Sequence, residues 1–185
     1  MGAFSARALG GERLELVPLR VGHAEEMAGV LADPGLHAFT GGAPDTLAAL
    51  RSRYRRMLAG SPDPAVSWLN WVIRLREPSC LVGTVQATLA PSGDDLGLGV
   101  GLVAEVAWVV GAPWQGRGIA TEAAGALVGW LVRQPVDAVV AHIHPGHRAS
   151  AAVASAVGLV PTGEWQDGEI VWRRIVRGEL RGSGP

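Results

Sequence analysis

The chain has 185 residues, of which 48% are hydrophobic, and its mean hydropathy is +0.22. These values predict a folded chain with a sizeable core and exclude intrinsic disorder. Sixteen basic residues, all of them arginine, oppose 17 acidic ones, which gives a net charge of −1. This balance argues against nucleic acid or a membrane as a partner, and the lack of lysine excludes Schiff-base chemistry.

Cysteine content and the length of the apolar runs argue against a disulfide-bonded, zinc-thiolate or membrane-spanning protein. The single cysteine, Cys80, can form no disulfide within the chain and offers no thiolate cluster for zinc. The first residues lack the charged and apolar regions of a secretory signal. The longest uncharged apolar run, residues 96–104, is too short to span a bilayer. We therefore expect a cytoplasmic protein.

The first third of the chain predicts one strand and two helices. Residues 14–19 alternate in polarity as in an edge strand, and Pro18 is tolerated only near the end of such a strand. Residues 23–31 and 46–58 have apolar side chains at helical spacing. Asp45 is placed to cap the second helix, because Pro44 interrupts any earlier periodicity. The apolar face of that helix comprises Leu47, Leu50, Tyr54 and Leu58. Its arginines predict a solvated face: Arg51, Arg53, Arg55 and Arg56.

The middle third predicts three strands in succession. A proline-rich loop at residues 61–64 precedes strands at 71–75 and 81–89, which are joined near Pro78. Residues 92–95 have the composition of a turn, and residues 100–110 then form a long apolar strand. The tryptophans of this region and of the last strand fill the core or line an acceptor cleft: Trp68, Trp71 and Trp172.

In the remainder of the chain, helices and strands alternate. A helix over residues 119–132 ends before Pro135, a strand follows at 138–143, and a short helix at 148–157 is closed by Gly158. The first of these helices is predicted to bury Ile119, Ala123, Leu127, Trp130 and Leu131. One or two strands follow, the last at 169–176, and a loose tail at 181–185 completes the chain.

This order of elements predicts one domain over residues 1–185, with a core at about 12–176 and a tail at 177–185. No internal repeat is present. Strands and helices mixed in this order are typical of an α/β fold in which helices pack on a mixed sheet.

Residues 115–120, with the sequence Gln-Gly-Arg-Gly-Ile-Ala, connect the long apolar strand to a helix. A strand, a glycine-rich turn and a helix start direct several backbone N–H groups at one point, where the helix dipole favours a bound phosphate. Gly116 and Gly118 allow the backbone close to the ligand, and Arg117 adds a charged donor if it faces the ligand. A tight turn without a ligand is the alternative.

Three segments, in this order, resemble the GNAT superfamily of N-acetyltransferases, and within it the branch that acetylates the N-termini of ribosomal proteins. Residues 104–110 resemble the central strand of that family, and residues 115–120 match its acyl-CoA signature, Gln/Arg-x-x-Gly-x-Gly/Ala. Residues 147–159 resemble its Asn-x-x-Ser helix, which ends in Gly-Phe. The resemblance covers about residues 12–176, with three departures: His147 replaces the asparagine, Ala154 a frequent tyrosine, and Leu159 the phenylalanine.

The resemblance implies a fold with a splayed pair of strands and acetyl-CoA as co-substrate, without a metal. The coenzyme would be bound by Trp108, Val109, Val110, Gln115, Gly116, Arg117, Gly118, Ile119, Ala120, Thr121 and His147. The acceptor would be a primary amine, on a peptide N-terminus or a small molecule, in a pocket shaped by residues 20–70. A homodimer is also compatible with the resemblance.

Two residues are assigned catalytic roles by the resemblance. Glu105, a carboxylate in an otherwise apolar strand, would act as general base through a water molecule; a solvent-facing edge position is the alternative. Ser150 would pass a proton to the departing thiolate, directly or through water, whereas an ordinary serine in a first helical turn is the alternative. No covalent intermediate is expected, because Cys80 lies outside the matching segments.

Three histidines near residue 145 leave another possibility open. His142 and His144 point to the same face of a strand, and a turn can bring His147 beside them, so a three-histidine metal site is conceivable. Histidines scattered at a strand end are the simpler interpretation. An acyl-CoA-binding module without turnover and a histidine-metal hydrolase are the rival functions.

Overall fold

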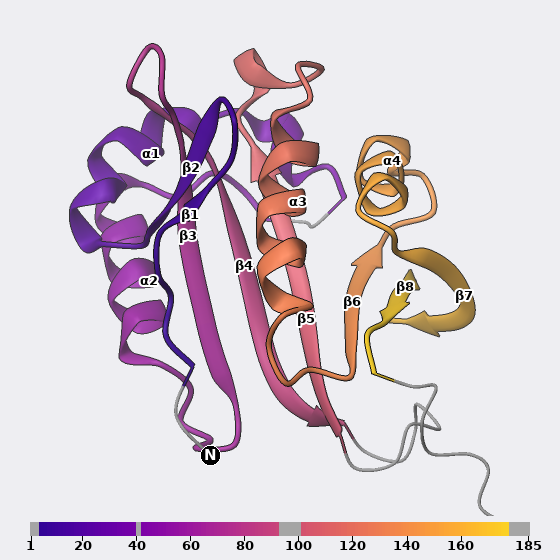
Figure 1. The fold of residues 1–185 in the computed structure, drawn as a ribbon. Coiled ribbons are helices and arrows are strands. Elements are labelled where there is room, and N and C mark those ends of the chain that lie inside the picture. Colours follow the sequence, from indigo (N-terminus) through magenta and orange to yellow (C-terminus); the bar gives the residue numbers. More distant parts are fainter. Residues whose placement is uncertain (1–3, 40–41, 93–100, 178–185) are drawn as a thin grey trace, which may run out of the picture.

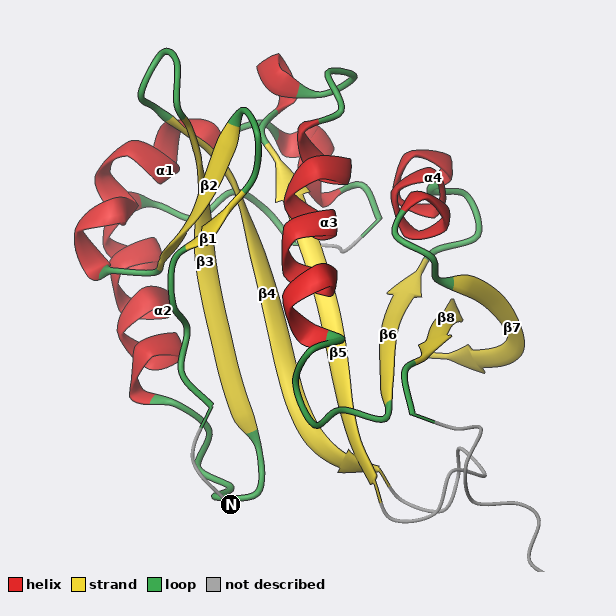
Figure 2. Ribbon diagram, viewed as in Figure 1, coloured by secondary structure: helices red, strands yellow, loops and turns green. Residues whose placement is uncertain are grey.

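The computed structural model describes residues 4–39, 42–92 and 101–177, which form one eight-stranded mixed sheet with helices on both faces (Figures 1 and 2). The strands lie in the order β1-β2-β3-β4-β5-β6-β8-β7. Their bounds are β1 (Leu9–Gly10), β2 (Leu14–Pro18), β3 (Ser67–Leu75), β4 (Leu81–Ser92), β5 (Gly101–Val110), β6 (Ala138–Ile143), β7 (Val160–Gln166) and β8 (Glu169–Ile175). The helices are α1 (Ala24–Val30), α2 (Leu47–Ala59), α3 (Ile119–Leu131) and α4 (Arg148–Ala156). Short 3-10 helices span Val21–His23, Pro34–His37 and Ala112–Trp114.

The predicted mixed α/β sheet is confirmed, but several details of the prediction are wrong. Two strands, β1 and β7, had no counterpart among the predicted segments, and β1 pairs with β2, so β2 is not the edge strand that its sequence suggested. Asp45 does not cap α2: the Thr46 hydroxyl accepts the hydrogen bond from Ala49 N–H at 3.2 Å, while Asp45 pairs with Arg53. The predicted turn at 92–95 and the tail at 181–185 fall largely or wholly outside the described residues.

Two apolar clusters occupy opposite faces of the sheet, because successive side chains of a strand point to opposite sides. Trp71 and Ile73 of β3 pack in the larger cluster with α3, whereas Val72, between them, packs in the smaller cluster with α1 and α2. Leu50 and Tyr54 of α2 are buried there. Leu47 and Leu58, at the ends of the same apolar face, are 37% and 49% exposed.

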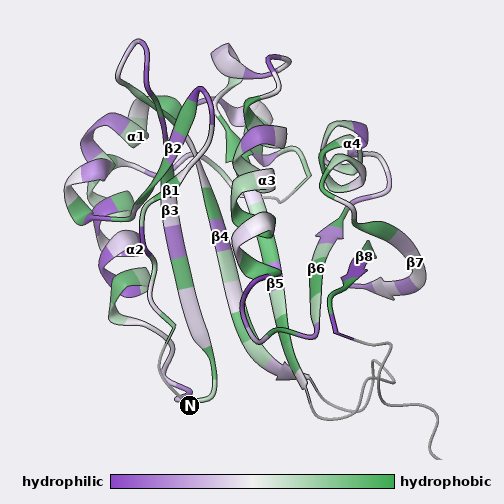
Figure 3. Cartoon of the chain, viewed as in Figure 1, coloured by the Kyte–Doolittle hydropathy of each residue, from purple (hydrophilic) through white to green (hydrophobic). Residues whose placement is uncertain are grey.

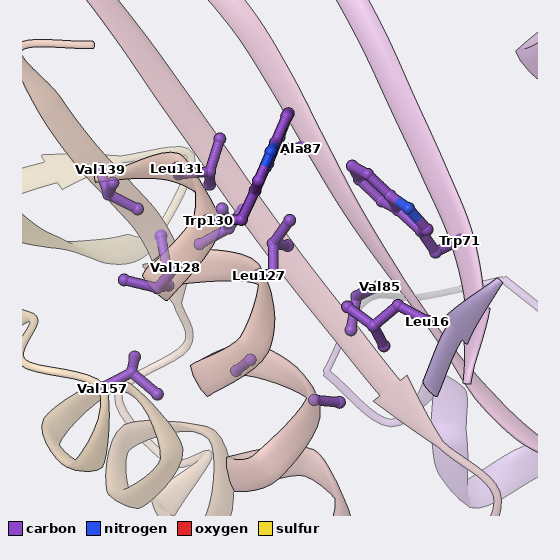
Figure 4. Close-up of a cluster of buried hydrophobic side chains, with 14 of the residues drawn as sticks. Leu16, Trp71, Val85, Ala87, Leu127, Val128, Trp130, Leu131, Val139 and Val157 are labelled. Atoms are coloured by element: carbon purple, nitrogen blue, oxygen red, sulfur yellow. The ribbon is translucent and has the colours of Figure 1, made fainter. Parts of the chain in front are cut away.

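Helix α3 crosses from β5 to β6 over the larger cluster, as its sequence predicted. All five of its expected core residues are buried, from Ile119 at 4% exposure to Leu131 at 0%. Figure 4 shows Leu127 and Trp130 directed from α3 toward the sheet, and the Trp130 ring meets Trp71 edge-on with 5.9 Å between ring centroids. Figure 3 shows the matching apolar residues along β5 and β6. No helix in the described ranges is long and apolar enough to cross a membrane.

The ladder between β5 and β6 is short, and this parallel pairing is the one that positions the site. It joins Val103 to Ala138, Ala104 to Val139 and Glu105 to Val140. On its other side β5 pairs with β4 along its whole length, from Gly101 to Val110. The second half of β5, after Glu105, therefore has a strand partner on one side and diverges from β6 on the other (Figure 1).

Close packing of β4 against the end of β5 depends on Gly83. A Cβ atom at this position would lie 2.2 Å from the Val109 carbonyl oxygen and 3.1 Å from the Val110 Cα. Because both neighbours are backbone atoms, the strands would have to move apart. We predict that Gly83→Ala lowers the free energy of unfolding by about 1–3 kcal/mol, measured by urea denaturation. As a control, Gly125→Ala in α3, where nothing lies within 4 Å, should raise it by roughly 0.5–1 kcal/mol. Equal effects of the two substitutions would contradict the packing argument.

Candidate active site

The loop from β5 to α3 takes its shape from two glycines and one glutamine. Gly116 and Gly118 have φ values of 73° and 74°, in the left-handed region that residues with a Cβ atom seldom adopt. The Gln115 side-chain amide donates a hydrogen bond to the Val110 carbonyl at 3.0 Å. Gln115 therefore connects the loop to the end of β5 through this hydrogen bond. The acyl-CoA signature, of which Gln115 is a part, did not indicate this role.

The N-terminus of α3 meets this loop without a capping side chain. Its N-cap residue is Gly118, so the backbone N–H groups of the first turn, from Ile119 to Thr121, are not capped by a side chain of that residue. These N–H groups and the helix dipole favour an anion at this point. Thr121 also lines a hollow of about 570 Å³ between α3 and α4.

Charge at the same helix end is balanced by Arg13, from the turn before β2. Glu122, in the first turn of α3, would repel a phosphate group if it were unpaired. The Arg13 backbone N–H and Nε bind its carboxylate at 2.7 Å and 2.8 Å, and Arg13 Nη1 donates to the Arg117 carbonyl at 3.1 Å. Burial raises the pKa of the Glu122 carboxyl, but the hydrogen bonds and charge of Arg13 outweigh this, so the pKa lies below its ordinary value.

Glu105 and His142 face each other where β5 and β6 diverge. The Glu105 Oε1 lies 3.4 Å from the His142 Nδ1, with side-chain exposures of 53% for the carboxylate and 17% for the imidazole. Both residues line a hollow of about 430 Å³, to which β4, β7 and β8 also contribute. Through the register, Glu105 lies beside Thr88, which in turn pairs with Trp68, on the face of the sheet that α1 and α2 cover elsewhere. Glu105 is thus solvent-accessible, although it does not lie on an edge strand.

His147 and Ser150 form the start of α4. The His147 Nδ1 accepts the hydrogen bond from Ser150 N–H at 3.4 Å, so this histidine is the N-cap of the helix. Its ring stacks on Phe39, with 4.3 Å between centroids, and the same phenylalanine contacts His144. Burial and then the charge of His144 lower the pKa of His147. A neutral ring is also what the cap requires, because Nδ1 must accept.

The predicted site residues lie on three segments: β5, the β5–α3 loop that follows it, and the start of α4. Their roles toward a coenzyme or substrate stay predictions. In the described ranges, no group of three or more His, Cys, Asp or Glu side chains is placed to hold a metal ion. His142 instead faces Glu105, while His144 and His147 contact Phe39.

The sequence analysis missed two residues that contact the segments of the predicted site. Arg13 lies 109 positions before its partner Glu122, and no local pattern marks such a pair. Phe39 lies in a segment without helical or strand periodicity, although it was within the stretch expected to shape the acceptor pocket.

Comparison with known proteins decides the family. The family model described as acetyltransferase (GNAT) domain matches residues 13–160. The chain belongs to this family. No protein of curated function matches the sequence significantly.

Solved structures of the GNAT acetyltransferase class share the fold. A GNAT-family acetyltransferase from Bacillus anthracis superposes with a TM-score of 0.73 at 16% identity, covering 92% of this chain and 99% of that one. An acetyltransferase from Agrobacterium tumefaciens is 26% identical, with a TM-score of 0.69 and coverages of 94% and 97%. RimL, a ribosomal α-N-protein acetyltransferase in complex with coenzyme A, gives 0.70 at 14% identity, with coverages of 94% and 100%.

The departures from the GNAT pattern have structural consequences. Leu159 is 1% exposed and fills the core position of the usual phenylalanine. Ala154, where many members of the family place a tyrosine, is fully buried in the core. An alanine has no ionisable group, so this position supplies no acid.

The cap formed by His147 predicts a loss of stability in acid. Because the pKa of His147 is lower in the folded chain, the unfolded chain takes up its proton first as the pH falls. The stabilisation is complete above about pH 6.5, the ordinary imidazole value, and is lost as the pH falls through the lower folded-state pKa. Asparagine caps helices without titrating. His147→Asn should therefore lose less free energy of unfolding than the unmodified protein between pH 7.5 and pH 5.5.

Urea denaturation at both pH values measures this difference, and two substitutions serve as controls. His147→Ala, which removes the cap, should cost about 1 kcal/mol at neutral pH. His37→Asn makes the same chemical change in another segment and should keep the acid sensitivity. An unchanged acid sensitivity in His147→Asn would contradict the role of the imidazole.

Proposed function

We propose that this protein transfers an acetyl group from acetyl-CoA to a primary amine, on a peptide N-terminus or a small molecule, by direct attack. The main support for the proposal is that an anion-binding helix N-terminus follows a strand that is paired on one side only. The uncapped N-terminus of α3 and its glycine loop offer N–H groups to a diphosphate, and they directly follow the half of β5 that has no strand partner on the β6 side. The coenzyme A complex of the RimL neighbour supports the choice of ligand.

Donor and acceptor would approach the opening from different sides. Backbone groups of Trp108 and the Val110 N–H would bind pantetheine in place of the missing strand, since buried N–H and C=O groups need partners. The Val109 carbonyl instead faces Gly83 of β4, and the Val110 carbonyl accepts from Gln115. The Glu105 carboxylate lines a hollow on the face of the sheet that α1 and α2 cover elsewhere. The amine would therefore approach from that face. The two substrates would then meet at the point where β5 and β6 diverge.

The transfer needs three contributions from the chain. Free amines have pKa values of roughly 8 to 10, so the acceptor is mostly protonated at neutral pH, and Glu105 would remove that proton through a water molecule. The freed lone pair attacks the thioester carbonyl, and a backbone N–H near Val109 or Val110 stabilises the resulting oxyanion. The C–S bond then breaks and the thiolate takes a proton from Ser150 or from water. The nitrogen, now bonded to the acetyl carbon, loses its second proton to water, and water returns the proton that Ser150 gives up.

A covalent route through Cys80 has no support in the structure. Cys80 lies in the turn before β4, and both its burial and the charge of Glu26 raise the pKa of its thiol. A thiol with a raised pKa is a poor nucleophile, because the thiolate is the reacting form.

The test is a screen of small amines and N-terminal peptides with acetyl-CoA, read by the release of free thiol. We expect release with at least one acceptor class, and thermal stabilisation by acetyl-CoA alone, equivalent to about 2.7 kcal/mol at 100 times Kd. Glu105→Gln should lower kcat by roughly 10²-fold or more at neutral pH and shift the profile to higher pH, while coenzyme binding persists.

A matched control is Glu77→Gln, the same change in the exposed turn between β3 and β4, which should leave turnover unchanged. Stabilisation by acetyl-CoA without thiol release from any acceptor would indicate a binding module and contradict the proposed transfer. An unaltered pH profile in Glu105→Gln would remove this carboxylate from the mechanism.

A further inference from the structure

The contact between β5 and β6 beyond their ladder extends the account of the site. We propose that His142 is a positioning residue that orients the Glu105 carboxylate for removal of the acceptor's proton. The inference rests on the proposed function, since it assumes that Glu105 is the base. It adds a residue that neither the glycine loop nor the central strand pattern marks.

Burial distinguishes the roles of the two side chains. The His142 imidazole is 17% exposed and the Glu105 carboxylate is 53% exposed. An exposed carboxylate on an open sheet face can adopt several rotamers, whereas a mostly buried ring is confined by its neighbours. The ring therefore fixes the carboxylate rather than the reverse, and the carboxylate is the group within reach of an amine or a water molecule.

The backbone holds the imidazole in place from the far side. In the β6–β8 ladder His142 pairs with Val171, and its neighbours Ala141 and Ile143 are 2% and 4% exposed. The α-carbon of His142 is thus set by a regular antiparallel ladder on the side away from β5. This is the support that a group acting on a catalytic side chain needs.

Position along the strands places the contact at the opening itself. The last pair of the β5–β6 ladder is Glu105 with Val140, and His142 lies two residues further along β6, on the same face. The pair therefore joins the last residue of the ladder on β5 to a residue of β6 beyond the ladder. At 3.4 Å it is a loose contact, and catalytic contacts of this kind often tighten only when substrate is bound.

Two other charged groups near the hollow pair with each other. Glu164 of β7 lines the hollow but pairs with Arg173 of β8. From β4 the register neighbour of Glu105 is Thr88, which carries no charge. Among these neighbours His142 is the group that the structure brings to the Glu105 carboxylate.

Substitutions that separate the two imidazole nitrogens test the proposal. Asparagine places its amide nitrogen near the position of Nδ1, the atom that faces Glu105, whereas glutamine places it near that of Nε2. We expect His142→Leu and His142→Gln to lower kcat by roughly 10- to 100-fold, with the KM for acetyl-CoA unchanged. His142→Asn should retain kcat within about threefold. Glu77→Gln in the exposed turn between β3 and β4 again serves as the control and should leave kcat unchanged.

Combination with Glu105→Gln distinguishes positioning from a structural role. In that background the carboxylate is gone, so His142→Leu should change kcat by less than about twofold. If His142→Leu lowers kcat by the same factor in the unmodified protein and in Glu105→Gln, the proposal is overturned. It is also overturned if His142→Leu keeps the wild-type kcat while Glu105→Gln lowers it. If His142→Leu does not fold, as judged by circular dichroism, His142→Gln is compared with His142→Asn in the same way. Wild-type turnover of Glu105→Gln would remove the carboxylate from the mechanism and overturn this proposal alone, whereas no transfer by the unmodified protein would overturn the proposed function as well.

Discussion

The structure depends on the unequal pairing of β5. This strand pairs with β4 along all of its length but with β6 through only Val103, Ala104 and Glu105. Complete pairing with β4 keeps the strand in register, which the close approach at Gly83 makes possible. Incomplete pairing with β6 leaves the second half of the strand with an edge inside the sheet. An edge in this position must be satisfied by something other than a neighbouring strand, and this need is the physical basis of the proposed coenzyme site.

Electrostatics at the N-terminus of α3 makes the same place suitable for a diphosphate. The helix dipole and the first N–H groups attract an anion, but Glu122 would oppose it if it were free. Arg13 binds that carboxylate with two hydrogen bonds and also holds the Arg117 carbonyl. The segment before β2 therefore contributes to the geometry and to the charge of a loop more than 100 residues away. In this way the turn before β2, which does not line the gap between β5 and β6, helps to form the site.

Much of the fold was predictable because its signals are local. The periodicity of α3 identified its five core residues, and β6 was predicted with the bounds that the structure shows. Strand β7 was not assigned a segment because it is exposed along most of its length, so its sequence does not alternate. The cap of α2 was assigned one residue early, since Asp45 and Thr46 are both good caps and only the backbone decides between them.

The individual residues of the candidate site could be predicted from the sequence, but the contacts between them could not. The glycine loop and Glu105 follow from residue types and their order along the chain. The contact of Glu105 with His142 depends on a parallel register between strands that are joined through α3, and the pair of Arg13 with Glu122 spans 109 positions. Neither register nor such distances are encoded in a short pattern, so these partners required the structure.

Amide hydrogen exchange with and without coenzyme A tests the central claim most directly. The account predicts that added coenzyme slows exchange in two stretches, residues 106–110 of β5 and residues 116–121 at the start of α3. Residues 103–105, which are already paired on both sides, should exchange at the same rate in both conditions. Binding of coenzyme A with no added protection in those two stretches would contradict the account.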